Sequence, residues 1–484
     1  MEATAVSLRL FCVIIAVTAT VSVKYEPNWA SLDSRPLPPW YDEAKVGIFL
    51  HWGVFSVPAF KSAWFWYYLH NKEASYVKFM EDNYPPSFTY GDFAPKFHAS
   101  LYDPDYWADI FEDAGAKYVV LVTKHHEGFT MWPSKHSWNW NAGDVGPKRD
   151  LLGELAVAVR KKKDIHFGVY HSLFEFYNPL FLQDQANLFT TQDFVRTKTM
   201  PELYELINTY KPEILWSDGD WLAPDTYWNS TNFLAWLYNE SPVKDVIVSN
   251  DRWGAGLYCK HGGFWNCKDK YNPGKVLPHK WENAMTVDSK AWTHRRDITD
   301  QDVLSVHDLL TTLSQTVSCG GNLLMNVGPD ADGRIIPIFE ERLRSFGAWM
   351  KVNGEAIYKS KPWHTQQDNA TLGVWYTTRK SVNVTGVYAI VLSWPKKGVL
   401  SLLAPVTQTT TVIEMLGVPG KELKYSKGVN GTIDITFPNL SPTQLPSTEA
   451  WVLKMTNLKN QNVYKRPDFV DNANIVPIDL GPKP

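Results

Sequence analysis

The sequence predicts an α/β domain folded as a (β/α)8-like barrel, followed by a C-terminal antiparallel β-sandwich. From about residue 40 to 355, short apolar runs alternate with amphipathic stretches, which is typical of parallel βαβ units. Each apolar run ends in polar or aromatic residues, and chemistry at the carboxyl ends of strands is typical of a barrel. After residue 362 the pattern changes to short β-rich runs separated by Gly, Pro and Asn, which indicates a sandwich.

Each predicted element corresponds to a definite stretch of sequence. The expected barrel strands are Val46–Leu50, Tyr118–Val122, Phe167–Tyr170, Ile214–Trp216, Val246–Val248 and Leu323–Met325. The stretches with helical periodicity are Leu151–Lys163, Pro201–Tyr210, Val303–Val317 and Ile338–Val352. The expected sandwich strands are Leu372–Thr378, Val387–Ser393, Val399–Leu403, Thr409–Met415, Thr432–Phe437 and Ala450–Met455. Residues 255–300 are loop-like and resist assignment.

The N-terminus has the features of a signal peptide. Arg9 precedes the apolar stretch Leu10–Val17, and small residues follow it. No other segment is long and apolar enough for a membrane span. The signal peptide and the sequons lead us to expect a secreted or lysosomal protein. The predicted parts of the chain are a signal peptide over 1–23, the barrel domain over 24–358, the sandwich over 359–458 and an irregular tail over 459–484.

Sequons and cysteines agree with the secretory route. Cys259 and Cys267 flank a Gly-containing loop and are expected to form a disulfide in an oxidising compartment, whereas Cys319 is expected to be a buried free thiol. The cysteines and histidines lack convincing zinc spacing, so no zinc site is expected. The sequons expected to carry glycans are at Asn229, Asn369, Asn383 and Asn430.

Charge and aromatic content restrict the class of ligand. The formal charge is only −3, and the single basic run, Arg160–Lys163, is expected to end a solvated helix, so nucleic acid is not an expected partner. The chain has 22 tryptophans, many beside polar strand ends, which favours a carbohydrate cleft over a purely structural aromatic core. A homo-oligomer remains compatible with the sequence.

Asp218 is the leading catalytic candidate. It follows the apolar run Ile214–Trp216, which places a carboxylate at a strand end between the indoles of Trp216 and Trp221. Carboxylates are rarely buried without a partner. The alternative is that Ser217-Asp218-Gly219 is only a turn, and Asp220 is a competing carboxylate farther from the strand.

Histidines follow two other strands. His51 comes directly after the first barrel strand, and His125 and His126 follow the second. Imidazoles donate and accept hydrogen bonds, which suits sugar hydroxyls. The alternative for the pair is one buried histidine and one loop histidine, because neighbouring strand residues point in opposite directions.

Together these motifs resemble α-L-fucosidases of the retaining glycoside hydrolase family 29, most closely the animal tissue and lysosomal type. The resemblance runs from about residue 25 to 455. The motifs that carry it are His51-Trp52-Gly53, Lys124-His125-His126-Glu127-Gly128-Phe129, Tyr170-His171-Ser172, Trp216-Ser217-Asp218-Gly219, Asn250-Asp251-Arg252-Trp253-Gly254 and Lys280-Trp281-Glu282.

The resemblance implies a retaining hydrolase that removes terminal α-L-fucose from fucosylated glycans and requires no metal or organic cofactor. It implies that Asp218 is the nucleophile and that Asp269 is the general acid/base, with Glu282 as the alternative acid/base. A structural role for Glu282 would pair it with a cation such as Arg295 or Arg296. The residues implied to bind or neighbour the sugar are His51, Trp64, His125, His126, Tyr170, His171, Trp216 and Arg252.

One position departs from the family pattern. Members commonly carry a glutamate directly before the first tryptophan of the Trp-Phe-Trp segment, whereas this chain has Ala63 before Trp64. A hydrogen bond to a charged group contributes about 1.5–3 kcal/mol, so weaker substrate binding or turnover is expected. The competing functional reading is therefore a weakly active or non-catalytic fucose-binding protein.

Overall fold

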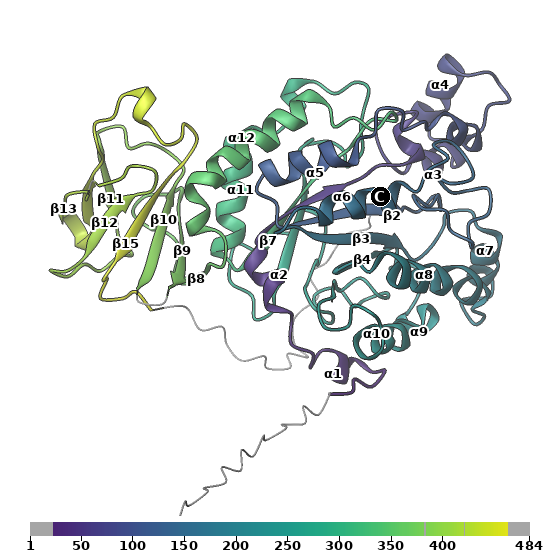
Figure 1. Ribbon diagram of the computed structural model, residues 1–484, viewed down its shortest axis with the longest axis horizontal. Coiled ribbons are helices and arrows are strands. Elements are labelled where there is room, and N and C mark those ends of the chain that lie inside the picture. The colour runs from purple at the N-terminus through teal and green to yellow at the C-terminus, as the bar shows by residue number, and fades with distance from the viewer. Residues whose placement is uncertain (1–22, 382–383, 421, 463–484) are drawn as a thin grey trace, which may run out of the picture.

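The computed structural model describes residues 23–462, apart from residues 382, 383 and 421. The predicted signal peptide up to residue 22, the sequon at Asn383 and the tail from residue 463 lie outside the described residues. Figure 1 shows a barrel domain with surrounding helices and, beside it, a smaller domain of strands.

The first domain contains a seven-stranded sheet in the order β5-β4-β3-β2-β1-β7-β6, and all of its pairs are parallel. Every residue of β1, β2, β4, β6 and β7 is buried. Such continuous apolar burial is expected of parallel strands covered on both faces. The strands are β1 (Val46–Leu50), β2 (Tyr118–Lys124), β3 (His166–Ser172), β4 (Ile214–Asp218), β5 (Val248–Ser249), β6 (Trp281–Thr286) and β7 (Gly321–Val327).

Residues 263–265 join the two edge strands of this sheet. Phe264 N donates to Ser249 O of β5 at 3.2 Å, and Trp265 N donates to Lys280 O next to β6 at 2.8 Å. Trp265 also forms a parallel bridge with Trp281. This short segment takes the place of an eighth strand, so the (β/α)8-like prediction is confirmed although only seven strands are regular.

The helices pack around the barrel, as Figure 1 shows for α5, α6 and α8. Side-chain caps begin several of them: Asp103 caps α5, Asp150 caps α6, and Ser305 forms a capping box with Asp308 on α11. The helices are α1 (Trp29–Leu32), α2 (Pro39–Ala44), α3 (Phe65–His70), α4 (Ala74–Asn83), α5 (Pro104–Asp113), α6 (Leu151–Arg160), α7 (Pro179–Ala186), α8 (Met200–Tyr210), α9 (Asp225–Trp228), α10 (Ser230–Asn239), α11 (Val306–Ser318) and α12 (Pro337–Asn353).

The C-terminal domain is built from two antiparallel sheets, as predicted. Their strand orders are β12-β15-β10-β9-β8 and β11-β14-β13. The strands are β8 (Lys361–Gln367), β9 (Val374–Lys380), β10 (Thr385–Val391), β11 (Val399–Leu402), β12 (Val412–Met415), β13 (Tyr425–Lys427), β14 (Ile433–Thr436) and β15 (Trp451–Thr456).

The larger C-terminal sheet has two buried faces. Leu453 belongs to the core between the two sheets, whereas its neighbour Val452 belongs to the core of the barrel domain. This alternation follows from the two-residue period of a strand. Trp349 on α12 donates from its indole to Ala450 O at 2.9 Å, so α12 lies at the contact between the domains. The boundary at residue 358 stays a prediction.

Candidate active site

Polar residues that follow the barrel strands meet at one end of the barrel, called the mouth below. Parallel strands share a direction, so their carboxyl ends lie at one edge. β3 and β4 are in register with Tyr170 beside Trp216 and Ser172 beside Asp218. The mouth residues are His51, His125, His126, Tyr170, Asp218, Arg252 and Asp269.

Asp218 is the last residue of β4 and is 8% exposed. Tyr170 donates its hydroxyl to Asp218 Oδ2 at 2.8 Å, and Arg252 donates to Asp218 Oδ1 at 2.9 Å. His126 Nε2 lies 3.8 Å from Asp218 Oδ2. A buried carboxylate with a cation and a hydroxyl donor has the partners that it needs, and a turn aspartate on the surface would have none of them.

Arg252 connects Asp218 to a second carboxylate. Its other terminal nitrogen donates to Asp269 Oδ1 at 2.6 Å, and the side chain of Asp269 is 47% exposed. The guanidinium lies over the Trp216 ring, 4.7 Å from its centroid. Burial would lower the pKa of Arg252, but Asp269 and Asp218 raise it well above its ordinary value. One fixed cation therefore holds both carboxylates at the mouth.

A short disulfide loop positions Asp269. Cys259 and Cys267 form a disulfide, with 5.0 Å between their Cα atoms. The buried carboxylate of Asp251 accepts hydrogen bonds from Cys259 N at 2.8 Å and from Asn266 N at 2.9 Å. Burial raises the pKa of Asp251 to about 6. The Asp251 carboxylate therefore holds both ends of this loop, which ends just before Asp269.

Glu282 lies away from the mouth. It is fully buried on β6 and accepts hydrogen bonds from Tyr41 and Tyr118, both at 2.7 Å, and from the Trp216 indole at 2.9 Å. Burial raises the pKa of Glu282, and these hydrogen bonds oppose the rise. The predicted pairing with Arg295 is wrong, because Arg295 binds Asp288 and Asp302 instead.

Asp220 is also buried, and both of its carboxylate oxygens accept hydrogen bonds. Tyr258 donates to Asp220 Oδ1 at 2.6 Å, and Gly254 N donates to Oδ2 at 3.1 Å. Burial raises the pKa of Asp220 to about 7, and the hydrogen bond from Tyr258 opposes the rise. Asp220 therefore supports the loop after β5, while Asp218 faces the mouth.

Aromatic rings form one wall of the mouth. The Trp64 ring lies 5.1 Å from that of His126 and 4.9 Å from that of Phe176, measured between centroids. Trp221 lies almost parallel to Trp64 at 6.1 Å. Ring faces of this kind are suited to the apolar side of a sugar. Ala63 is 4% exposed, so the position before Trp64 is buried.

His171 is not brought to the mouth. Its Nε2 lies 3.1 Å from Glu202 Oε2 on α8, within a buried cluster that also contains Lys124 and Lys198. Burial, with Lys124 nearby, lowers the pKa of His171 to about 4. The prediction that His171 neighbours the sugar fails because Tyr170 faces inward, and adjacent strand residues point to opposite faces.

Sequence reasoning missed several residues that support the mouth. Asn326 Oδ1 lies 2.6 Å from His51 Nδ1, and Ser172 Oγ lies 2.7 Å from His126 Nδ1. Arg252 Nε donates to Asn266 O at 3.3 Å. Asn326 and Ser172 both follow apolar runs, so the strand-end pattern was a signal for them, whereas Asn266 in its loop had none.

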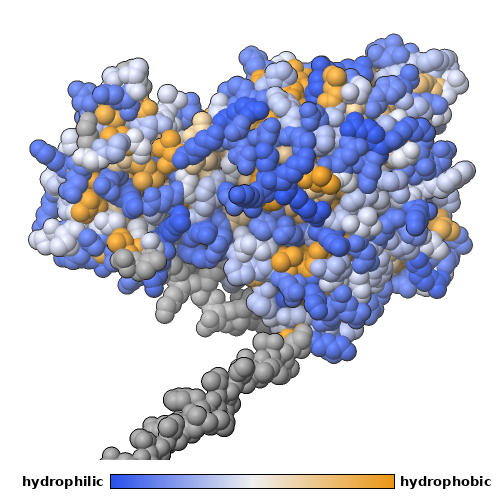
Figure 2. All heavy atoms as spheres, in the orientation of Figure 1, coloured by the Kyte–Doolittle hydropathy of each residue, from blue (hydrophilic) through white to orange (hydrophobic). Residues whose placement is uncertain are grey.

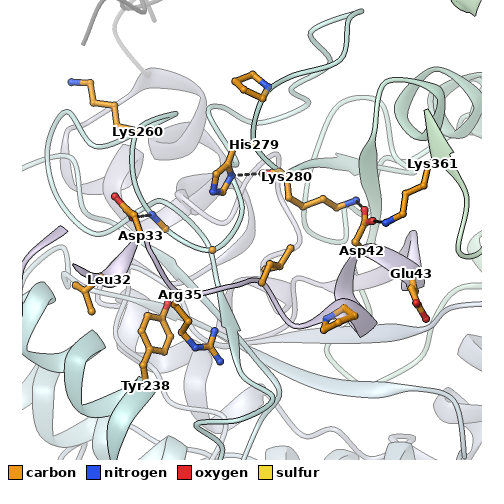
Figure 3. Close-up of a pocket in the computed structure, with 15 residues that line it drawn as sticks. Leu32, Asp33, Arg35, Asp42, Glu43, Tyr238, Lys260, His279, Lys280 and Lys361 are labelled. Carbon is orange, nitrogen blue, oxygen red and sulfur yellow. Dashed lines mark hydrogen bonds and ion pairs between the residues drawn. The ribbon is translucent and has the colours of Figure 1, made fainter. Parts of the chain in front are cut away.

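A separate groove of about 510 Å³ lies at the opposite end of the barrel. Figure 3 shows Asp42 between Lys280 and Lys361, and Asp42 Oδ1 accepts from Lys280 at 2.6 Å. Burial would raise the pKa of Asp42, but Lys280, Lys45 and Lys361 lower it well below its ordinary value. Asp42 and Lys45 precede β1, Lys280 precedes β6, and Lys361 begins β8. This ion-pair network therefore joins elements on the face away from the mouth.

Within residues 23–462, apart from the three omitted positions, no group of three or more His, Cys, Asp or Glu could hold a metal ion. In the same part of the chain, no helix is long and apolar enough to cross a membrane. Figure 2 shows one face of the molecule, where apolar residues form small separated patches among hydrophilic ones.

Two family models match the chain. The α-L-fucosidase model matches residues 12–355, and the α-L-fucosidase C-terminal domain model matches residues 366–456. An α-L-fucosidase from Branchiostoma floridae is 56% identical over 450 residues, which cover 93% of this chain and 99% of that protein. A tissue α-L-fucosidase from Homo sapiens is 55% identical over 437 residues, covering 90% of this chain and 92% of that protein.

A solved structure is similar over almost the same length. It is the Thermotoga maritima α-fucosidase in complex with a mechanism-based inhibitor, with a TM-score of 0.76 and 31% identity. The match covers 90% of this chain and 100% of that chain.

Proposed function

This chain belongs to the α-L-fucosidase family, and we propose that Asp218 is its nucleophile and Asp269 its general acid/base. The chain is a glycoside hydrolase that acts on α-L-fucosides. The observation that carries the assignment is the bridge formed by Arg252, which holds both carboxylates at the mouth. Retaining glycosidases use two carboxyl groups that lie close together across the scissile bond.

The first step cleaves the glycosidic bond. Asp269 enters this step in its protonated form. The Asp218 carboxylate attacks the anomeric carbon, the bond to the leaving oxygen breaks, and the proton moves from Asp269 to that oxygen. Tyr170 and Arg252 hold the two oxygens of Asp218, so the attacking group is oriented before the sugar binds. The product of this step is a fucosyl ester of Asp218.

The second step reverses these roles. Asp269, now a carboxylate, takes a proton from water, and the water oxygen attacks the anomeric carbon. The ester bond to Asp218 breaks, and fucose leaves with its configuration retained. The 47% exposure of Asp269 supports this role, because water and a leaving glycan both need access to the residue.

The sugar lies between the histidines and the aromatic wall in this proposal. His51, His125 and His126 bind hydroxyls, Trp64 packs on the ring, and Trp216 lies beneath Tyr170 and Arg252. The stacking of Tyr170 on Trp216, with centroids 5.6 Å apart, supports a rigid floor. Glu282 binds the Trp216 indole from below and has a structural role.

The test of Asp218 uses an aryl α-L-fucoside and the variant Asp218→Asn. Removing a group on which both steps depend is expected to reduce kcat by at least about 10³-fold. Asp225→Asn is the matched control, since Asp225 accepts a hydrogen bond from Trp29 away from the mouth. Methanolysis followed by NMR should give the α-methyl fucoside first. Equal rates for wild type and Asp218→Asn, or a β-product, would overturn the assignment.

We propose further that the chain enters the secretory pathway and is secreted or delivered to lysosomes. The Cys259–Cys267 disulfide supports an oxidising compartment. Asn369 and Asn430 are exposed and Asn229 is half-buried, so glycans have access to the described sequons. N-terminal sequencing of the protein from animal cells should begin near residue 24, and glycosidase treatment should reduce its mass. A homo-oligomer stays a prediction, to be tested by light scattering.

A further inference from the structure

In three imidazole rings at the mouth, Nδ1 is the nitrogen that faces a polar side chain of the protein. His51 Nδ1 lies 2.6 Å from Asn326 Oδ1, and His126 Nδ1 lies 2.7 Å from Ser172 Oγ. His125 Nδ1 lies 3.4 Å from Glu127 Oε2 but forms no hydrogen bond with it. The position of the proton on a neutral imidazole is set by such a partner, because one ring nitrogen donates and the other accepts.

Asn326 faces His51 with its oxygen. The amide nitrogen of Asn326 donates to Trp292 O at 2.6 Å, which fixes the orientation of the amide. An amide oxygen only accepts hydrogen bonds, so His51 Nδ1 carries the proton. Asn326 is 1% exposed and lies on β7, so neither group is free to turn.

Ser172 faces His126 as an acceptor for a different reason. A serine hydroxyl has one proton, and Ser172 donates it to Phe174 O at 2.7 Å. His126 Nδ1 must therefore donate to Ser172 Oγ. Ser172 is fully buried at the end of β3, directly beside Asp218 in the sheet.

In His51 and in His126, Nε2 is the nitrogen that does not contact Asn326 or Ser172. His126 Nε2 is the ring atom that approaches Asp218 Oδ2. Burial, together with His125, lowers the pKa of His51 to about 3, so this ring is neutral and has a single proton. With that proton on Nδ1, Nε2 of His51 has only a lone pair.

We propose that Asn326 is a positioning residue that fixes the tautomer of His51, so that Nε2 of His51 accepts a hydrogen bond from a sugar hydroxyl. This inference rests on the proposed function, since it assumes that the sugar binds at the mouth. The consequence is a specificity rule: at His51 the sugar must donate a hydrogen bond. A substituent that only accepts, such as fluorine, cannot replace the hydroxyl.

The first experiment measures dissociation constants of the wild-type protein by calorimetry. The ligands are L-fucose and its monodeoxy and monofluoro analogues. At the hydroxyl that His51 binds, deoxy and fluoro analogues are both expected to bind about 2- to 13-fold more weakly than fucose. A fluoro analogue that binds as tightly as fucose at every ring position would overturn the inference.

The second experiment assigns the effect to Asn326. Asn326→Leu removes the acceptor and is expected to bring the fucose-to-fluorofucose ratio at one position close to 1. Asn326→Asp retains an acceptor for His51 Nδ1 and is expected to retain the ratio. Asn322→Leu, at another buried asparagine of β7 that donates to Tyr41 O, is the matched control and should also retain it. The inference is contradicted if Asn326→Leu retains the wild-type ratio of fucose to fluorofucose binding, or if Asn322→Leu loses that ratio to the same extent.

Asn326→Ala provides a second comparison if Asn326→Leu does not fold. Its matched control is Asn322→Ala, at the other buried asparagine of β7. Loss of discrimination in Asn326→Ala alone supports the inference, and equal values in both variants contradict it. Failure of the proposed function is recognised separately: in that case fucose itself does not bind, or Asp218→Asn keeps its activity.

Discussion

The acid/base assignment gives the sharpest prediction, because its two candidates differ so strongly in environment. Asp269 is 47% exposed at the mouth and contacts Arg252. Glu282 is 0% exposed and binds three donors inside the barrel. The perturbations are Asp269→Asn and Glu282→Gln, which remove each acid with little change in shape.

For Asp269→Asn, the expected loss depends on the leaving group. A general acid contributes about 10²- to 10⁴-fold, and only where the leaving oxygen needs a proton. Hydrolysis of a fucosyl disaccharide should therefore fall by that factor. A dinitrophenyl fucoside has a leaving group that needs no proton, so the formation of its fucosyl-enzyme should change little.

For Glu282→Gln, the expected loss is one of stability. The Trp216 indole can only donate, so the glutamine oxygen must face it. The amide group then faces the hydroxyls of Tyr41 and Tyr118, which must turn their protons elsewhere. Leaving a buried polar group unsatisfied costs about 1–3 kcal/mol. This lowers Tm by a few degrees and affects both substrates by the same factor.

The assay is kcat/KM for both substrates in both variants, together with Tm from thermal unfolding. Exogenous azide should restore turnover of the dinitrophenyl fucoside by Asp269→Asn, because azide needs no general base. If the leaving-group dependence appears in Glu282→Gln and not in Asp269→Asn, the reasoning from exposure and contacts is refuted.

Three further predictions concern other parts of the molecule. Ala63→Glu introduces a carboxylate beside Trp64 and is expected to lower KM by about tenfold or more. It is also expected to lower Tm, because the position is buried. An unchanged KM in a folded variant would contradict this prediction. Opening the disulfide with Cys259→Ser and Cys267→Ser, eight residues apart, should cost about 2–3 kcal/mol in urea unfolding and reduce kcat through Asp269. Burial raises the pKa of Asp220 from 3.8 to about 7, so its contribution to stability is present below pH 4 and is lost as the pH rises through 7. Asp220→Asn should remove roughly 3 kcal/mol of the stability difference between pH 5 and pH 8, and parallel pH profiles for the two proteins would refute this.

The strand-end residues were predictable because a parallel sheet collects them without further information. His51, Asp218 and Arg252 each follow an apolar run, and parallel strands place such residues at one edge. Four helices were predictable for a similarly local reason, namely their apolar periodicity. Among them, α11 begins with a capping box and α12 begins with Pro337.

Other parts of the fold had no local signal. The segment 263–265 closes the barrel with only three residues, and its role depends on the backbone hydrogen bonds to β5 and β6. The direction in which His171 points depends on which face of β3 is turned inward. That choice is made by the packing of the whole barrel and of α8, where Glu202 binds the ring.

By itself, the sequence determined the fold class, the family and the set of side chains available at the mouth. The sequence also favoured Asp218 over Asp220. Only the tertiary structure showed which donors each of them binds, and only it placed Glu282 beneath the site and Asp269 at its edge. The physical reason is that a carboxylate's role depends on its burial and its donors. Arg252 and Tyr170 orient Asp218, Tyr258 occupies Asp220, and three buried donors hold Glu282. These partners come from distant parts of the chain, so no local pattern contains them.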